Sequence, residues 1–104
     1  VIHYIDDNYS DQNLSLELLS NKFYISTFYL SRKFKELTHV SINNYINNTR
    51  IGQAQRLLLE NKLKISEISE VCGFDTIQYF YTVFKRVSGK TPKEYKNEYL
   101  DKEK

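Results

Sequence analysis

The feature that most restricts the fold is an internal repeat, in which two parts of the chain match at an offset of 49 or 50 residues. Residues 29–35 read YLSRKFK and residues 79–85 read YFYTVFK, so a Tyr, a large apolar residue and a final Phe-Lys recur. Upstream, residues 16–20 (LELLS) match residues 65–69 (ISEIS). Each copy predicts a short helix, a turn and a longer helix, the outline of a helix-turn-helix unit. A bundle of helices that merely share a packing pattern is the alternative, and it does not explain a match that spans helix, turn and helix together.

The rest of the sequence favours an all-α fold of seven helices. The chain has three Gly and one Pro and few alternating apolar stretches, so helices account for the pattern best. Apolar residues at helical spacing predict a buried stripe in the longer helix of each copy, formed by Leu30, Phe34 and Leu37 and by Phe80, Phe84 and Val87. Polar residues mark helix starts at Ser26 or Thr27, at Ser41, at Asp75 with Gln78 as a capping box, and at Thr91 before Pro92. The last four residues, 101–104, are charged and are expected to fray.

A long helix expected over residues 41–61 connects the two copies. Its apolar residues lie on two faces rotated well past a right angle, one with Ile42 and Ile46 and the other with Ala54 and Leu58. One helix would therefore serve a small core at each end. About twenty residues at 1.5 Å each span ~30 Å, close to the ~34 Å between successive major grooves on one face of B-DNA. Gly52, in the middle, is interpreted as a close-packing position rather than a hinge.

The outward face of the longer helix in each copy carries residue types that read DNA. On a helical wheel, Phe28, Arg32 and Lys35 lie opposite the first stripe with Ser31 flanking them. Opposite the second stripe lie Gln78, Thr82 and Lys85, flanked by Tyr81 and Arg86. Neither face has an acid at its centre. Arg, Gln, Ser and Thr hydrogen-bond base edges, and an aromatic ring can contact a thymine methyl group. An ordinary solvated surface is the alternative, and the large rings of Phe28 and Tyr81 count against it.

Two stretches resemble AraC/XylS-type transcriptional regulators. Residues 73–96, GFDTIQYFYTVFKRVSGKTPKEYK, are similar to the signature at the end of that family, and residues 14–37, LSLELLSNKFYISTFYLSRKFKEL, resemble its first helix-turn-helix. Arg50, Ala54 and Leu57-Leu58 stand where the family's linker helix has such residues. The resemblance implies a bacterial DNA-binding domain whose two helix-turn-helix units enter adjacent major-groove segments. The start of the chain is also similar to effector domains of two-component response regulators of this family.

The resemblance implies a division of the chain and a set of DNA contacts. The first subdomain would cover residues 1–40, the linker helix 41–61 and the second subdomain 62–104, with recognition helices at about 26–37 and 76–88. Base contacts are implied for Phe28, Ser31 and Arg32 in the first unit and for Gln78, Tyr81 and Thr82 in the second. Phosphate contacts are expected from Thr27, Lys33, Lys35, Ser41, Thr76, Lys85 and Lys93. The family often has Arg where this chain has Thr82, so weaker or different base reading by the second unit is expected.

Other classes of function find little support in the sequence. The histidines His3 and His39 and the single cysteine Cys72 share no ligand or nucleophile spacing, and there is no Gly-rich phosphate loop. An enzyme is therefore not expected, and neither a catalytic residue nor a cofactor nor a metal is assigned. The net charge of only +2 does not by itself favour DNA. A helical protein-interaction module is thus the alternative function, and salt separates the two because DNA affinity falls steeply with ionic strength.

The expected partner is double-stranded DNA, with RNA polymerase as a further candidate. The chain does not begin with Met and is interpreted as part of a longer protein with an N-terminal sensory or receiver domain, with a trimmed mature form as the alternative. No apolar run reaches the ~18–20 residues of a transmembrane helix, and there is no signal-peptide pattern. A single cysteine also fits a reducing compartment, so a cytoplasmic location without a membrane partner is expected.

Overall fold

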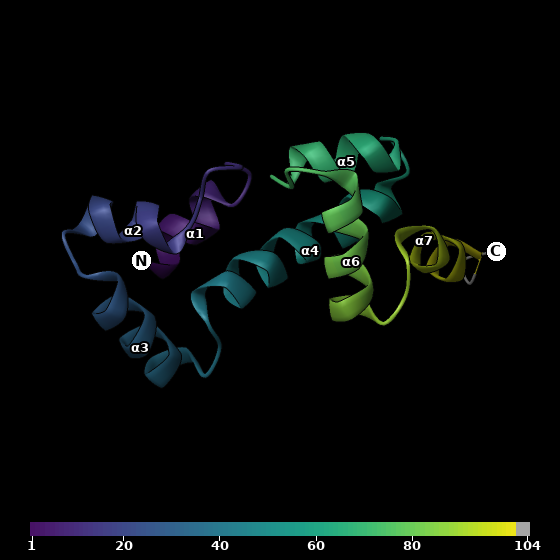
Figure 1. The fold of residues 1–104 in the computed structure, drawn as a ribbon. Coiled ribbons are helices and arrows are strands. Elements are labelled where there is room, and N and C mark those ends of the chain that lie inside the picture. Colours follow the sequence, from purple (N-terminus) through teal and green to yellow (C-terminus); the bar gives the residue numbers. More distant parts are fainter. Residues whose placement is uncertain (102–104) are drawn as a thin grey trace.

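A long central helix joins two groups of helices in the computed structural model, which describes residues 1–101 (Figure 1). The elements of this range are α1 (Ile2–Asn8), α2 (Leu16–Phe23), α3 (Thr27–Thr38), α4 (Ile42–Glu60), α5 (Ile65–Val71), α6 (Ile77–Ser88) and α7 (Pro92–Asp101). The molecule is elongated, with extents of 50 × 23 × 22 Å. We call α1–α3 the first group and α5–α7 the second group. The prediction of an all-α fold with seven helices is confirmed, while residues 102–104 of the expected frayed end lie outside the described part of the chain.

The central helix α4 contributes to two separate cores. Its first half supplies Ile42 and Ile46 to a core that is completed by Ile5, Leu14, Leu19, Leu30 and Phe34. Its second half supplies Ile51, Ala54 and Leu58 to a core that is completed by Ile68, Cys72, Phe74, Phe80, Val83 and Phe84. The two faces of α4 inferred from the sequence therefore pack as expected.

In each predicted apolar stripe the first two residues are buried and the last one is not. Leu30, Phe34, Phe80 and Phe84 are buried, but Leu37 is 72% exposed and Val87 is 39% exposed. Leu37 lines an open groove with Val1 and Ile2, because no described helix covers the last turn of α3 on that side. In α6 the third core residue, beside Phe80 and Phe84, is Val83 and not Val87; Val83 is 1% exposed.

Polar caps start most of the helices, with one correction to the sequence-based assignment. The hydroxyls of Ser15, Ser26 and Ser41 each accept a backbone N–H at 3.1 Å, from Leu18, Tyr29 and Asn44. At the start of α7, Thr91 Oγ1 accepts from Glu94 N, and Thr91 N donates to Glu94 Oε1. The capping box predicted for Asp75 with Gln78 is wrong. Thr76 is the residue with extended backbone before α6, so its Oγ1 accepts from Tyr79 N at 3.1 Å while Asp75 stays in the preceding turn.

The turns of the two helix-turn-helix units share one backbone geometry. Ile25 N donates to Ser20 O at 3.1 Å, and Phe74 N donates to Ser69 O at the same distance. The residue before each donor has a positive φ, 57° at Tyr24 and 95° at Gly73. Tyr24 extends into solvent and is 96% exposed, whereas a Cβ on Gly73 would lie 2.6 Å from Tyr9 O. The second turn therefore requires glycine because the loop between α1 and α2 leaves no space for a side chain.

The interpretation of Gly52 as a close-packing position is wrong. Gly52 is exposed on α4, and a Cβ added there would have no heavy atom within 4 Å. The helix is continuous from Ile42 to Glu60.

Gly52→Ala is expected to raise the free energy of unfolding by about 0.5–1 kcal/mol, because alanine loses less conformational freedom than glycine in a helix and meets no neighbour here. Urea denaturation of the two proteins measures the difference. Gly73→Ala is the contrasting variant, expected to destabilise because of its positive φ and the nearby Tyr9 O. A loss of stability in Gly52→Ala would show that α4 needs the freedom of glycine at its centre, as a hinge would.

Candidate nucleic-acid interface

The outward face of α3 brings together the residues predicted for the first DNA reader. An open hollow is lined by Leu16, Thr27, Phe28, Ser31, Arg32 and Lys35. Phe28 is 73% exposed and contributes a large aromatic ring to this hollow. The three predicted base-contact residues of this unit thus form one surface with the predicted phosphate-contact residues Thr27 and Lys35.

The guanidinium of Arg32 is held on this surface by two neighbours on the same helix. Its Cζ lies 5.6 Å from the centroid of the Phe28 ring, within the range of a cation–π contact. Its Nε lies 3.9 Å from Glu36 Oε1, one turn further along α3. Glu36 was not among the residues predicted for this site, although its position four residues after Arg32 is the spacing of an ion pair on one helix face. The two contacts restrain a long side chain that would otherwise sample many rotamers.

The outward face of α6 presents the second set of predicted base-contact residues. Gln78, Tyr81 and Thr82 are all exposed on it, and so is Lys85. Thr82 Oγ1 donates to the Gln78 carbonyl oxygen at 3.1 Å, so its hydroxyl proton is used within the helix. Arg86, which the helical wheel placed at the edge of this face, lines a different hollow with Val40, Asn44, Asn48 and Val87.

The remaining predicted phosphate-contact residues are dispersed. Lys33 lines the groove between α1 and α3 rather than the hollow around Phe28, and its Nζ lies 3.9 Å from Glu36 Oε2. Ser41 and Thr76 are the N-caps of α4 and α6, positions beside the unpaired backbone N–H groups that favour anions. Lys93 is exposed in the first turn of α7.

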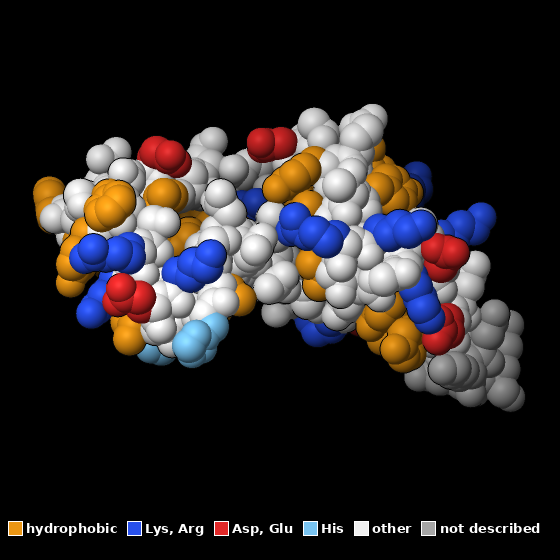
Figure 2. Space-filling view, turned by 60° about the horizontal axis from the view of Figure 1, so that its bottom comes forward, with side chains coloured by type: hydrophobic (Ala, Val, Ile, Leu, Met, Phe, Trp, Pro, Cys, Tyr) orange, Lys and Arg blue, Asp and Glu red, His pale blue; other side chains and the backbone are white. Residues whose placement is uncertain are grey.

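Basic side chains are spread over the molecule rather than concentrated in one block. Figure 2 shows Lys and Arg side chains from one end of the visible face to the other, with a few acidic side chains between them. The described residues contain no group of His, Cys, Asp and Glu that could hold a metal ion. Cys72 is fully buried, and burial raises the pKa of its thiol to about 11, so it packs as a protonated, apolar side chain. Among the same residues, no helix is both long and apolar enough to cross a membrane.

Two helix-turn-helix units joined by one long helix form the scaffold of the described residues. A family model described as "Helix-turn-helix domain" matches residues 19–98. The chain belongs to this AraC-type helix-turn-helix family.

Several known proteins with similar sequences or structures are transcription regulators. The xylose operon regulatory protein of Escherichia coli (strain K12) is 41% identical over 68 residues, which cover 65% of this chain and 17% of that protein. The C-terminal domain of AraT, a response regulator from Geobacillus stearothermophilus, is 35% identical with a TM-score of 0.89, over 92% of this chain and 79% of the other. The DNA-binding domain of AdpA, solved in complex with a target DNA, is 25% identical with a TM-score of 0.90, over 97% and 90% of the two chains. These similarities are to regulators and not to enzymes, in agreement with the expectation from the sequence.

Thr76→Ala is expected to lower the free energy of unfolding by ~1 kcal/mol, because the N–H of Tyr79 loses its acceptor at the start of α6. Thr82→Ala is the matched control on the same helix and is expected to have a smaller effect, since Thr82 is exposed in the helix interior and its hydroxyl bonds only to Gln78 O. Urea denaturation of both variants measures the difference. A loss for Thr76→Ala no larger than that for Thr82→Ala would contradict the contribution of the cap.

Proposed function

We propose that this domain binds double-stranded DNA at an asymmetric site, with α3 and α6 in adjacent segments of the major groove. The observation that carries the proposal is the pair of unlike outward faces, with Phe28, Ser31 and Arg32 on α3 and Gln78, Tyr81 and Thr82 on α6, attached to one continuous helix. The 19 residues of α4 span roughly 28 Å, which is near the ~34 Å of one turn of B-DNA. The structure of AdpA with its target DNA supports the same class of partner.

The side chains on α3 suit direct reading of base edges. A guanidinium can donate two hydrogen bonds to a guanine edge, and an aromatic ring can contact a thymine methyl group. Arg32 and Phe28 are exposed next to each other and are restrained by mutual contact, so less conformational entropy is lost when they bind. Thr27, Lys35, Ser41, Thr76, Lys85 and Lys93 are proposed to contact phosphates around the two readers. Lys33, on the flank of α3, is proposed as a peripheral phosphate contact.

We further infer that the first half-site contributes most of the sequence preference. The first reader includes Arg32, whereas the second includes Thr82, whose hydroxyl proton already bonds to Gln78 O. A hydroxyl used in this way can still accept a hydrogen bond but offers no free donor to a base.

The whole protein is proposed to be a cytoplasmic regulator with an N-terminal sensory or receiver domain. This chain spans 17% of the xylose operon regulatory protein, and AraT is described as a response regulator. RNA polymerase is a candidate partner of such a protein. The alternative function, a helical protein-interaction module, is favoured by one observation, the open and mostly apolar groove of about 490 Å³ between α1 and α3.

Arg32→Ala is expected to cost ~1–3 kcal/mol on the preferred sequence and to relax selectivity at one base position. Lys35→Ala and Lys93→Ala should weaken binding to all sequences similarly, because phosphates carry no sequence information. Fluorescence anisotropy with preferred and random duplexes at several salt concentrations measures these effects. Equal losses on both duplexes for Arg32→Ala would reassign that residue to the backbone, and an affinity independent of salt would support the protein-interaction module.

Selection of preferred sequences from random DNA is expected to give an asymmetric consensus of two unlike half-sites about 10–10.5 base pairs apart. The stronger consensus should lie in the half-site contacted by α3. Exchanging Arg32 for Ala before selection should remove the preference at one base position of that half-site and leave the rest of the consensus in place. A palindromic consensus bound only by a dimer, or a strong consensus confined to the second half-site, would contradict the proposal.

A further inference from the structure

Arg50 is a buried cation between the two groups of helices. Arg50 lies in the middle of α4 and is only 6% exposed. Its Nε donates to Tyr9 O at 2.7 Å and its Nη2 donates to Asp11 O at 2.8 Å. Both carbonyls belong to the loop between α1 and α2, so one rigid guanidinium holds two points of the first group.

The same guanidinium contacts the second group. Its Cζ lies 5.7 Å from the ring centroid of Phe74, a residue of the second core in the turn between α5 and α6. Burial lowers the pKa of Arg50, and the nearby Asp75, Tyr79 and Asp11 oppose that shift. A buried charge that lost its partners would be costly, so the contacts of Arg50 with both groups are expected to persist together.

A second contact, at Gly73, brings the same loop against the second group. A Cβ on Gly73 would lie 2.6 Å from Tyr9 O and 3.0 Å from Ser10 O. The corresponding residue of the first unit, Tyr24, has a similar backbone and a fully solvated side chain. Gly73 therefore meets two requirements: a φ of 95°, which residues with a side chain rarely adopt, and the close approach of the loop, which Tyr24 does not face.

The loop that Arg50 holds is braced by its own hydrogen bonds. Asp11 N donates to Asn8 O at 3.0 Å, and Leu14 N donates to Asp11 O at 3.1 Å. Asn13 N also donates to Asp11 Oδ1 at 2.9 Å. A displacement of this loop would consequently move α1 and α2 with it, rather than being absorbed locally.

We propose that Arg50 is the positioning residue that fixes the orientation of the second helix-turn-helix unit relative to the first. Without it, the two groups would be connected by α4 and by the packing of the loop against Gly73, with no polar side chain anchoring that loop to α4. The helix also has the exposed Gly52 two residues further on and so a less stable segment at that point. Arg50 spans this segment by attaching the first group directly to the turn that begins α6. This inference rests on the proposed function: by fixing the orientation of the two units, Arg50 sets the spacing between the two DNA half-sites that the domain accepts.

The orientation of the two groups of helices is tested without DNA by measuring the distance between two spin labels by electron paramagnetic resonance. The labels are attached at Asn21→Cys in α2 and at Glu70→Cys in α5, both exposed positions. Cys72 is buried and should stay unlabelled, which the protein without added cysteines verifies. The wild-type background should give one narrow distance distribution. Arg50→Gln and the milder Arg50→Lys, which cannot reach both carbonyls in the same fork geometry, should broaden it. The milder variant keeps the test valid if the first one unfolds.

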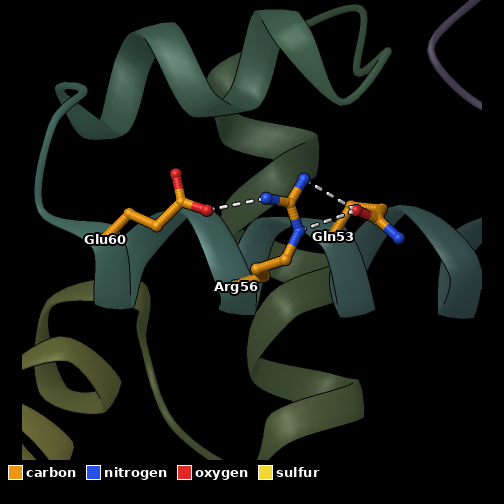
Figure 3. A network of polar contacts seen from close by, with 3 residues as sticks. All are labelled: Gln53, Arg56 and Glu60. Atoms are coloured by element: carbon orange, nitrogen blue, oxygen red, sulfur yellow. Dashed lines mark hydrogen bonds and ion pairs between the residues drawn. The ribbon is translucent and has the colours of Figure 1, made fainter.

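Arg56→Lys is the matched control on the same helix. The guanidinium of Arg56 is hydrogen-bonded within α4, with Nη1 2.7 Å from Glu60 Oε2 and with Nε and Nη2 3.2 and 3.0 Å from Gln53 Oε1 (Figure 3). Its substitution should leave the distribution narrow. Gly73→Ala should shift or broaden the distribution, whereas Gly89→Ala, which has a similar positive φ but no atom within 4 Å, should not.

Duplexes whose half-sites are moved apart or together by one or two base pairs test the consequence for DNA. The wild-type domain should show a steep preference for one spacing, and Arg50→Lys should flatten that preference, with about tenfold weaker binding at the best spacing. A narrow distribution in both Arg50 variants would overturn the positioning role whatever the DNA result. A broadened distribution with unchanged spacing preference would overturn the role in half-site spacing and leave DNA binding itself intact.

Discussion

The structure depends on a single helix that must bury apolar residues in two different directions. Ile42 and Ile46 of α4 belong to one core, and Ile51, Ala54 and Leu58 belong to the other. A helix with one apolar face would complete only one core and leave the other group without a covering element. The change of face along α4 therefore accounts for the division into two groups, one packed on each half of the helix.

The two repeated units differ where their surroundings differ. The turn hydrogen bonds from Ile25 and Phe74 are equivalent, yet Tyr24 is solvated where Gly73 is enclosed. Lys33 is half exposed on α3, while the corresponding Val83 is buried against α4. Local backbone geometry was thus retained in both copies, and the side chains follow from which neighbouring element covers each face. The outward faces of α3 and α6 likewise keep the same helix position but carry different side chains.

Periodicity and capping residues were sufficient to predict the helices, because both signals are local in the sequence. The ends of the apolar stripes at Leu37 and Val87 were mispredicted, since burial there depends on an element that covers them and not on helical spacing. The cap of α6 differed by one residue because Asp75 and Thr76 are both good capping types, and only the backbone distinguishes them. The contacts of Arg50 with Tyr9 and Asp11 join positions 41 and 39 residues apart, for which no local pattern exists.

The low net charge is compatible with DNA binding because many acids act within the helices. Glu67 accepts from Lys64 N, Glu94 accepts from Thr91 N, and Glu60 pairs with Arg56. These acids stabilise the starts and the faces of helices, but their negative charges offset those of the Lys and Arg residues. The positive potential of the domain is therefore weak, and we expect a modest non-specific attraction to phosphates. Selectivity is a ratio between specific and non-specific affinity. A domain with weak non-specific attraction to DNA can therefore discriminate well between sequences with few base contacts. This requires that α3 and α6 reach their half-sites together. The orientation of the two helices is consequently as important as the residues on them.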